Sequence, residues 1–378
     1  MFPFDKILTY IANEQCALVI GPEIMHFDNK PMNMYLRNKL NEQYKDEVEG
    51  YYYYAEDGLF QFPPQEQSVK SDVAQSMRTE CHRLPLTAGY DEEILKTIAQ
   101  LPFHLILSIN PDTFLSDTFF KYGVTHRFSH YRKGERPSDD VAPPTREAPL
   151  IYNIAGSVLE DESLVLDYED LFSLIGSSLS PSGLPDGLRT ALEKIRTFVF
   201  IGFNFEKWHT QVMLRILCGK AGYRKFAGPH KVSDNTRVFL ANQFKIDFWD
   251  TQKGDFLTTF MQNAAQFVDP DPKNASRPFL RTLLENPLRP EETNIIRDIQ
   301  NAQYARAITN LSNYAKGNTE NEDMATGLSS RYNLLTQKQA QMDSRDYLTT
   351  LNQIADAVIQ LTRSISDSKW ALYTDIQA

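Results

Sequence analysis

Residues Leu101–Asp112 read LPFHLILSINPD, and this stretch decides the fold of the N-terminal part of the chain. The apolar run Leu105–Leu107 predicts a buried strand, and the polar residues that begin at Ser108 predict the end of that strand. Short apolar runs bounded by turn residues are typical of parallel sheets, in which ligands bind just beyond the carboxyl ends of the strands. Asn110 and Asp112 are therefore the first candidates for site residues.

Three other apolar runs end in the same way, each at a glycine-containing tip. They are Cys16–Ile20 before Gly21-Pro22-Glu23, Leu150–Ile154 before Ala155-Gly156-Ser157, and Thr197–Ile201 before Gly202-Phe203-Asn204. Arg237–Leu240 and Ile246–Phe248 are also predicted as short strands. Helical patterns separate the strands, which predicts an α/β fold with a Rossmann-type parallel sheet and helices on both faces.

The four strand ends together predict a crevice of nucleotide size. Glycine lets a backbone approach a ligand closely, and Asn, Asp and Ser supply directional hydrogen bonds to ribose and phosphate. Each end also has a simpler interpretation. Gly21 alone is equally typical of a strand-ending turn, and Asn110 and Asp112 would equally suit a turn in which Asp112 caps the next helix.

Composition limits the class of protein. The net charge of -10 and the pI near 5.3 give no global positive field for nucleic acid. The three cysteines form no CxxC pair, and the seven histidines show no metal-ligand spacing, so we expect no metal site. Residues 1–30 lack the pattern of a secretory signal, and no apolar run approaches the roughly 20 residues of a spanning helix. These features predict a cytoplasmic protein that does not enter a membrane.

Prolines and polar residues at 268–292 mark a change in the character of the chain. We therefore predict a nucleotide-binding domain at residues 1–285 and a small all-α bundle at residues 286–378. Helical stripes of apolar residues follow the boundary at Glu291–Tyr314, 324–340 and 344–366. Tyr131–Pro149, rich in proline and charge, is predicted to be a surface loop.

The order of the strand-end motifs carries a resemblance. GPE after the first strand, SINPD after a central strand, a GS tip after the next and GFNFEKW after the last resemble the sirtuin-like NAD-consuming fold over roughly residues 1–270. The resemblance is greatest to the bacterial anti-phage branch, whose members destroy NAD. The glycine-alanine-glycine loop of that family is reduced here to Gly21-Pro22-Glu23.

The resemblance implies roles for individual residues, with NAD as the substrate and no metal. Asn110 would orient a water or a ribose hydroxyl beside the nicotinamide ribose, and Asp112 would hold the neighbouring loop or sugar. Gly21 would lie against the pyrophosphate, and Gly202 and Asn204 would meet the adenosine half. The other implied substrate-binding residues are Pro22, Glu23, Ser108, Gly156, Ser157 and Phe203.

Ala155 departs from the family, which has a catalytic histidine immediately before the glycine of the GS tip. An alanine cannot accept a proton, and loss of a positioned general base typically costs about 10²–10⁴-fold in rate. Either the chain is a natural pseudoenzyme, or it is a deliberate His-to-Ala variant of a hydrolase, made to trap NAD. The intact neighbours Gly156 and Ser157 favour the second interpretation.

Residues 286–378 resemble the effector-associated domains of bacterial conflict proteins, which join an effector to a sensor by like-with-like contacts. The resemblance is carried by NIIRDIQNAQYARAITNL, GLSSRYNLL and YLTTLNQIADAVIQL. The alternative is a bundle that only covers the first domain or mediates self-association. An effector of this kind is silent until a partner protein or homo-oligomerisation activates it.

The leading functional hypothesis is an NAD+ hydrolase that gives nicotinamide and ADP-ribose. A non-catalytic NAD-binding or nucleotide-binding adaptor is the alternative that Ala155 supports. A protein deacylase is a third hypothesis, against which the missing cysteine pairs count, because the usual sirtuin pattern includes a zinc module.

Overall fold

The structure is a computed structural model in which the chain divides into two compact units. The sheet unit comprises residues 1–116 and 125–282, and the helical unit comprises residues 117–124 and 283–378. The structure describes residues 2–46, 48–63, 67–87, 90–133, 143–179, 184–218, 223–229, 232–250, 254–285, 287, 290–300 and 302–377.

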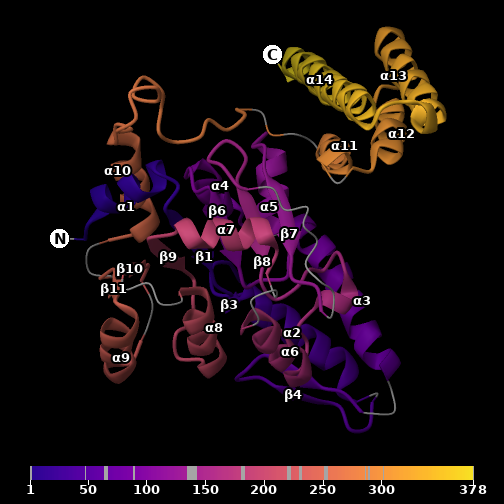
Figure 1. Cartoon of the computed structure of the whole chain (residues 1–378). Coiled ribbons are helices and arrows are strands. Elements are labelled where there is room, and N and C mark those ends of the chain that lie inside the picture. The colour runs from indigo at the N-terminus through magenta and orange to yellow at the C-terminus, as the bar shows by residue number, and fades with distance from the viewer. Residues whose placement is uncertain are drawn as a thin grey trace. The chain divides into compact units, whose positions relative to one another are not determined.

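A seven-stranded sheet with the order β11-β10-β9-β1-β6-β8-β7 forms the centre of the sheet unit (Figure 1). Every neighbouring pair of strands is parallel. In chain order the strands are β1 (Cys16–Ile20), β6 (Leu105–Ser108), β7 (Arg127–His130), β8 (Leu150–Asn153), β9 (Thr197–Ile201), β10 (Lys225–Ala227) and β11 (Ile246–Phe248).

Ten helices accompany the sheet in the described part of residues 1–282, and Figure 1 shows them on both sides of it, with α7 in front. They are α1 (Phe4–Ala12), α2 (Met32–Tyr44), α3 (Gln67–Arg83), α4 (Glu93–Gln100), α5 (Phe114–Lys121), α6 (Tyr168–Leu179), α7 (Asp186–Lys194), α8 (Trp208–Cys218), α9 (Asp234–Phe244) and α10 (Phe256–Gln266). Short 3-10 turns lie at Leu84–Leu86 and Asp161–Ser163.

Both faces of the sheet are buried, as parallel sheets require. All five residues of β1 are buried because each face has its own apolar cover. Val19 and Phe200 belong to a core cluster that also contains residues of α6, α7 and α8. The Phe2 ring lies 5.4 Å from the ring of Phe226 in β10 and 5.8 Å from that of Phe256 in α10. The predicted parallel sheet with helices on both faces, followed by a helical region, is confirmed.

The connections change direction at β1. The strands β6, β7 and β8 lie on one side of β1, and β9, β10 and β11 lie on the other. Such a reversal opens a crevice between the loops that follow the two central strands. Here these loops begin with Gly21 after β1 and Gly202 after β9.

The two glycine loops cross in close contact. The Gly21 N–H donates to the Ile201 carbonyl at 2.9 Å, and the Glu23 N–H donates to the Gly202 carbonyl at 2.8 Å. A Cβ on Gly21 would lie 2.2 Å from the Gly202 oxygen, and one on Gly202 would lie 2.4 Å from the Ile24 nitrogen. Gly202 also has a φ of +63°, which favours glycine. The crossing therefore requires glycine both at position 21, after β1, and at position 202, after β9.

Two antiparallel hairpins complete the sheet unit. The first pairs β2 (His26–Phe27) with β3 (Lys30–Pro31), and the second pairs β4 (Tyr52–Tyr54) with β5 (Leu59–Gln61). The second hairpin is joined to the segment before α6, since the Phe60 N–H donates to the Leu166 carbonyl at 2.8 Å.

The predicted strand Arg237–Leu240 is wrong, because these residues lie within α9. Ser233 caps this helix, and its Oγ accepts a hydrogen bond from the Thr236 N–H. The apolar residues Val238 and Phe239 are exposed, so the run is not a buried strand. The strand predicted at Ile246–Phe248 is confirmed as β11. Within the predicted loop Tyr131–Pro149, residues 134–142 lie outside the described residues.

The helical unit contains four long helices, α11 (Pro290–Gln300), α12 (Tyr304–Tyr314), α13 (Thr319–Lys338) and α14 (Ser344–Gln377), with a 3-10 turn at Gln339–Gln341. Their shared core includes Ile295, Leu311 and Ile354, each fully buried. The stripe predicted over Glu291–Tyr314 is divided between α11 and α12, because Ala302 has a φ of +57°. None of the helices in the described part of the chain has the length and apolar character of a membrane span.

The glycine crossing yields a test of the fold. We expect Gly202→Ala to lower the free energy of unfolding by about 2–4 kcal/mol, because alanine adds both a left-handed backbone strain and a backbone clash. The control is Gly176→Ala in α6, where nothing lies within 4 Å of an added Cβ. That change should raise stability by up to about 1 kcal/mol. Urea denaturation of both variants measures the difference, and equal stability of Gly202→Ala and the parent would contradict the crossing.

Candidate functional site

Three cavities of the sheet unit lie at the carboxyl ends of β1, β6, β8 and β9. The inner pocket has a volume of about 20 Å³ and is lined by Ser108, Asn110 and Asp112, among others. The central cavity has about 440 Å³, and its lining includes Arg37, Asp57, Ala155 and His209. The outer cavity has about 510 Å³, and its lining includes Gly202, Glu206 and Asp255.

Shared lining residues show that the three cavities adjoin one another, and together we call them the crevice. Pro22 and Asn33 line both the inner pocket and the central cavity. Glu23 and Asn204 line both the central and the outer cavity. The two larger cavities each have the size of a small-molecule site, and a dinucleotide would need both.

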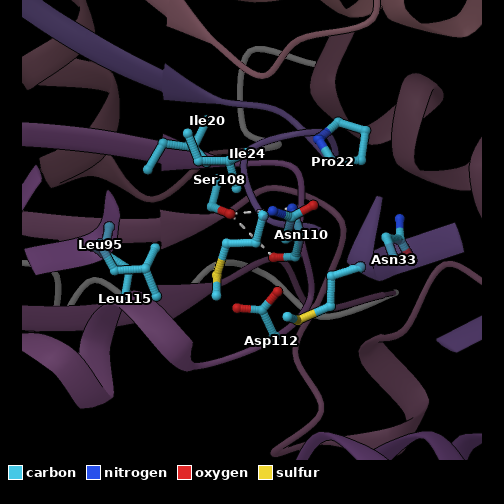
Figure 2. A pocket seen from close by; sticks show the side chains of 11 residues that line it. Ile20, Pro22, Ile24, Asn33, Leu95, Ser108, Asn110, Asp112 and Leu115 are labelled. Atoms are coloured by element: carbon cyan, nitrogen blue, oxygen red, sulfur yellow. Dashed lines mark hydrogen bonds between the residues drawn. The ribbon is translucent and has the colours of Figure 1, made fainter. Parts of the chain in front are cut away.

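Asn110 lies at the centre of the inner pocket (Figure 2). Its Nδ2 donates to the Gly21 carbonyl at 3.2 Å, and its backbone N–H donates to Ser108 Oγ at 3.1 Å. Its Oδ1 is buried and has no hydrogen-bond partner among the described residues. An unpaired buried acceptor costs about 1–3 kcal/mol, and the pocket has room for one water molecule. The amide is therefore held in place with its oxygen ready to accept a hydrogen bond.

Asp112 both caps a helix and lines the inner pocket. Its Oδ1 accepts a hydrogen bond from the Phe114 N–H at 3.1 Å, which caps the start of α5. Its backbone carbonyl accepts from Asn153 Nδ2 at 2.7 Å, which ties the tip of β6 to the tip of β8. The residue also lines the inner pocket. The capped turn is thus present, and it fixes the carboxylate beside Asn110.

Glu23 and Asn204 form the partition between the central and the outer cavity. Asn204 Nδ2 donates to Glu23 Oε1 at 2.7 Å, and Asn204 Oδ1 accepts from the Glu206 N–H at 3.1 Å. The carboxylate and the amide are each half-buried. The hydrogen bond joins the loop after β1 to the loop after β9, directly above the glycine crossing.

Arg37 is a buried cation in the wall of the central cavity. Its guanidinium donates to Asn33 Oδ1 at 3.0 Å, to the Gly58 carbonyl at 2.5 Å and to the Val165 carbonyl at 3.1 Å. Burial lowers its pKa from the ordinary value. The arginine therefore binds α2 to the turn of the β4–β5 hairpin and to the segment before α6, and it brings a positive charge to the cavity.

Ala155 and His209 line the same cavity. The methyl group of Ala155 follows β8, and the imidazole of His209 lies in the first turn of α8. His209 Nδ1 lies 3.8 Å from Oδ1 of Asp57, which belongs to the turn of the β4–β5 hairpin. Burial lowers the pKa of His209, Asp57 raises it, and Lys207 and Arg37 lower it further. The net lowering of its pKa favours the neutral form of the imidazole.

The outer cavity has an acidic lining. Glu23, Glu206 and Asp255 line it, and none of its described lining residues is Lys or Arg. Glu206 accepts hydrogen bonds from the Ser233 N–H at 2.6 Å and from Thr236 Oγ1 at 2.8 Å. Asp255 caps α10 through the Thr258 N–H at 2.6 Å. These carboxylates are fixed in position, and their charge favours hydroxyl and amino groups over phosphate.

Four predicted substrate-binding residues, Gly21, Gly156, Ser157 and Phe203, are not among the described residues that line the three cavities. Gly21 instead forms the backbone crossing, and Phe203 packs between Phe200 and Phe205 at ring distances of 5.2 and 5.0 Å. Their predicted contacts with substrate remain predictions.

Gly156 and Ser157 form a buried turn. Gly156 has a φ of +83°, and a Cβ there would lie 1.9 Å from the Ser163 oxygen. Ser157 is fully buried, its N–H donates to Ser163 Oγ at 2.9 Å, and its own Oγ accepts a hydrogen bond from the Leu159 N–H at 3.2 Å. The fold thus requires both residues, whether or not position 155 carries a catalytic group.

The structure also adds site residues that sequence reasoning missed, namely Asn33, Arg37, Asp57 and His209. Asn33, Arg37 and Asp57 come from α2 and the β4–β5 hairpin. These elements do not follow a strand of the main sheet, so the search for polar residues at strand ends did not find them. His209 stands directly after the GFNFEKW motif, and this proximity was the one signal that pointed to it. Among the described residues, no group of three or more His, Cys, Asp or Glu side chains has the arrangement of a metal site.

Comparison with known families agrees with this geometry. The family model of the SIR2-like domain matches residues 104–244, from immediately before β6 to the end of α9. The matched range contains the tips of β6, β8 and β9 and the histidine of the central cavity. No curated protein matches the chain.

The Glu23–Asn204 partition yields a stability test. We expect Asn204→Asp to destabilise the protein by about 1–3 kcal/mol at pH 7.5, because two carboxylates would then face each other in place of a hydrogen bond. Their mutual repulsion raises the folded-state pKa of the pair, so the penalty is present at neutral pH and shrinks as the pH falls through that raised pKa. Urea denaturation at pH 7.5 and pH 5 measures both effects.

The matched control is Asn33→Asp, the same change beside a cation. Its new carboxylate would accept a charge-assisted hydrogen bond from Arg37 Nε, which is now 3.0 Å from Asn33 Oδ1. Stability should stay the same or increase. An equal loss in both variants would show that the charge on Glu23 does not determine the result.

Proposed function

We propose that the sheet unit binds NAD+ along the crevice and hydrolyses the bond between nicotinamide and ribose, giving nicotinamide and ADP-ribose. SIR2-like domains use NAD+, and the match to that family covers three of the four strand tips that form the crevice, those of β6, β8 and β9. The observation that carries the proposal is the unpaired oxygen of Asn110, fixed in a pocket of water size that opens beside two cavities of ligand size.

The residues of the crevice suit the steps of this reaction. Asn110 Oδ1 would hold the attacking water, or a hydroxyl of the nicotinamide ribose, by accepting its hydrogen. The ribose gains positive charge as nicotinamide leaves, and the carboxylates of Glu23 and Asp57 in the central cavity favour that charge. Positioning and electrostatics can carry much of the acceleration, because nicotinamide is a good leaving group.

The same crevice supports a second function, a nucleotide-binding adaptor without turnover. The observation in its favour is Ala155, which places a methyl group at the strand tip where the resemblance implies a histidine. The two functions share NAD+ binding and differ in the release of nicotinamide.

We propose that the helical unit controls this activity. Its resemblance to effector-associated domains supports a role in joining the enzyme to a protein partner or to further copies of the chain, in bacterial defence against phage by NAD depletion. Large apolar side chains at Met324, Leu334 and Leu348 are exposed on α13 and α14, which suits a contact surface.

The inner pocket provides the test of this proposed function. We expect calorimetry to detect NAD+ binding to the full chain, and we expect Asn110→Ala to reduce nicotinamide release by about 10²-fold, since the water loses its hydrogen-bond acceptor. The assay covers a range of protein concentrations, because activation by self-association would raise the activity per molecule. Asn263→Ala in α10 is the control, since its amide bonds only the Thr259 carbonyl at 2.8 Å outside the crevice. Absence of NAD+ binding would refute the proposal.

The acidic outer cavity yields a prediction on cofactor choice. If the adenosine half lies there, the extra phosphate of NADP+ would meet three carboxylates, and NADP+ should bind at least about 10-fold more weakly than NAD+. Asp255→Asn removes one charge yet keeps a side chain that caps α10. Titration calorimetry should show a smaller preference for NAD+ in this variant. Equal affinities of the parent for both dinucleotides would place the adenosine elsewhere.

A further inference from the structure

The central cavity holds an imidazole, although position 155 does not provide it. His209 and Ala155 both line this cavity of about 440 Å³, so an imidazole on α8 faces the same space as the alanine after β8. His209 lies on α8, the helix that follows the β9 tip, and it lines the central cavity. In the proposed function this cavity, and not the outer one, holds the nicotinamide ribose.

His209 has a carboxylate beside its Nδ1, on the side where the orienting carboxylate of a histidine general base lies. Its Nδ1 lies 3.8 Å from Asp57 Oδ1, is buried, and has no hydrogen-bond partner among the described residues. The side chain is 21 % exposed, and the exposed part therefore lies away from Nδ1. Hydrogen bonds between catalytic groups are often long without substrate and shorten in the complex. Asp57 as the acceptor favours the tautomer with the proton on Nδ1, which leaves a lone pair on Nε2.

The second carboxylate oxygen of Asp57 is held by a hydrogen bond. Its Oδ2 accepts a hydrogen bond from the Tyr168 hydroxyl at 2.5 Å, which joins the hairpin turn to the start of α6. The Tyr168 ring in turn packs edge-on against Tyr54 of β4, with 5.3 Å between ring centroids. In catalytic triads a carboxylate orients the histidine base. Here Asp57 would be that carboxylate, and Tyr168 holds it in place.

The charged groups around His209 come from several elements. Asp57 of the hairpin turn raises its pKa, whereas Arg37 of α2 and Lys207 before α8 lower it, as does burial. Glu23 and Glu56 line the same cavity. The net result is a pKa below the ordinary value of a histidine, which favours the neutral ring that a general base needs.

We propose that His209, positioned by Asp57, is the general base of the reaction in place of the histidine absent at position 155; this inference rests on the proposed NAD+ hydrolysis. The oxygen of water forms a bond to C1′ of the nicotinamide ribose while the C1′–N bond breaks. The electron pair of that bond leaves with nicotinamide, which becomes neutral. The water proton passes to Nε2 of His209 and then to solvent, so the products are nicotinamide, ADP-ribose and one proton.

The main variant is His209→Gln, which keeps a polar side chain but cannot take up a proton. We expect NAD+ affinity by calorimetry to change little and nicotinamide release to fall by about 10²-fold or more. His82→Gln, at an exposed position of α3, is the matched control and should leave both quantities unchanged. Adding Ala155→His to the His209→Gln variant should restore part of the rate, because it returns an imidazole to the same cavity.

The pH profile separates a positioning role of Asp57 from a purely structural one. In the parent, the rate should fall as the pH drops through the lowered pKa of His209, below the usual value of about 6.5. Asp57→Asn removes the charge that raises this pKa, so the acid limb should move to lower pH while the maximal rate falls. A structural role would reduce the rate without moving the limb.

The outcomes distinguish this inference from the proposed function. Absence of NAD+ binding to the parent refutes the proposed function and the inference with it. NAD+ binding and turnover that persist in His209→Gln refute the inference alone. NAD+ binding without turnover in the parent, followed by turnover in Ala155→His, also refutes it, because His209 would then not act as the base.

Discussion

The crossing of the β1 and β9 loops is the constraint on which the crevice depends. The Gly21 and Gly202 backbones approach so closely that neither residue can carry a Cβ, and two backbone hydrogen bonds hold them there. The crossing lies where the strand order reverses, the place at which α/β sheets open for ligands. Because the two backbones are fixed, Glu23 and Asn204, each two residues after a glycine, lie close together. Asn204 Nδ2 donates to Glu23 Oε1 at 2.7 Å, and the pair separates the central cavity from the outer cavity.

The parts of the crevice differ in charge as well as in size. The outer cavity is lined by carboxylates, and the central cavity combines carboxylates with Arg37 and Lys207. The inner pocket is small and contains a fixed amide. A dinucleotide presents a diol and an adenine, then a negative pyrophosphate, then a cationic nicotinamide ribose. Arg37 and Lys207 lie in the cavity next to the partition, where the pyrophosphate would pass in the proposed mode of NAD+ binding.

The sequence allowed us to predict the buried strands and the residues at their carboxyl ends. The strand tips after β1, β6, β8 and β9 follow from apolar runs that end at glycine or polar residues. Asn110, Glu23 and Asn204, which were predicted as site residues, line the cavities at these tips. Asp57 and Arg37 could not be predicted, because a long stretch of chain and a tertiary contact bring the β4–β5 hairpin to the sheet. Arg237–Leu240 was mistaken for a strand because Val238, Phe239 and Leu240 form a continuous apolar run, although only Leu240 of the three is buried in α9.

The turn at Gly156 and Ser157 changes how Ala155 should be understood. The intact GS pair suggested that only the histidine had been lost, as if from an otherwise conserved site. The structure gives the pair a reason of its own, because Gly156 must avoid the Ser163 oxygen and the buried Ser157 hydroxyl accepts a hydrogen bond from the Leu159 N–H. The pair would be needed in an enzyme whose base lies elsewhere. Ala155 therefore does not by itself indicate an inactive chain, since the imidazole of His209, with Asp57 beside it, lines the same cavity.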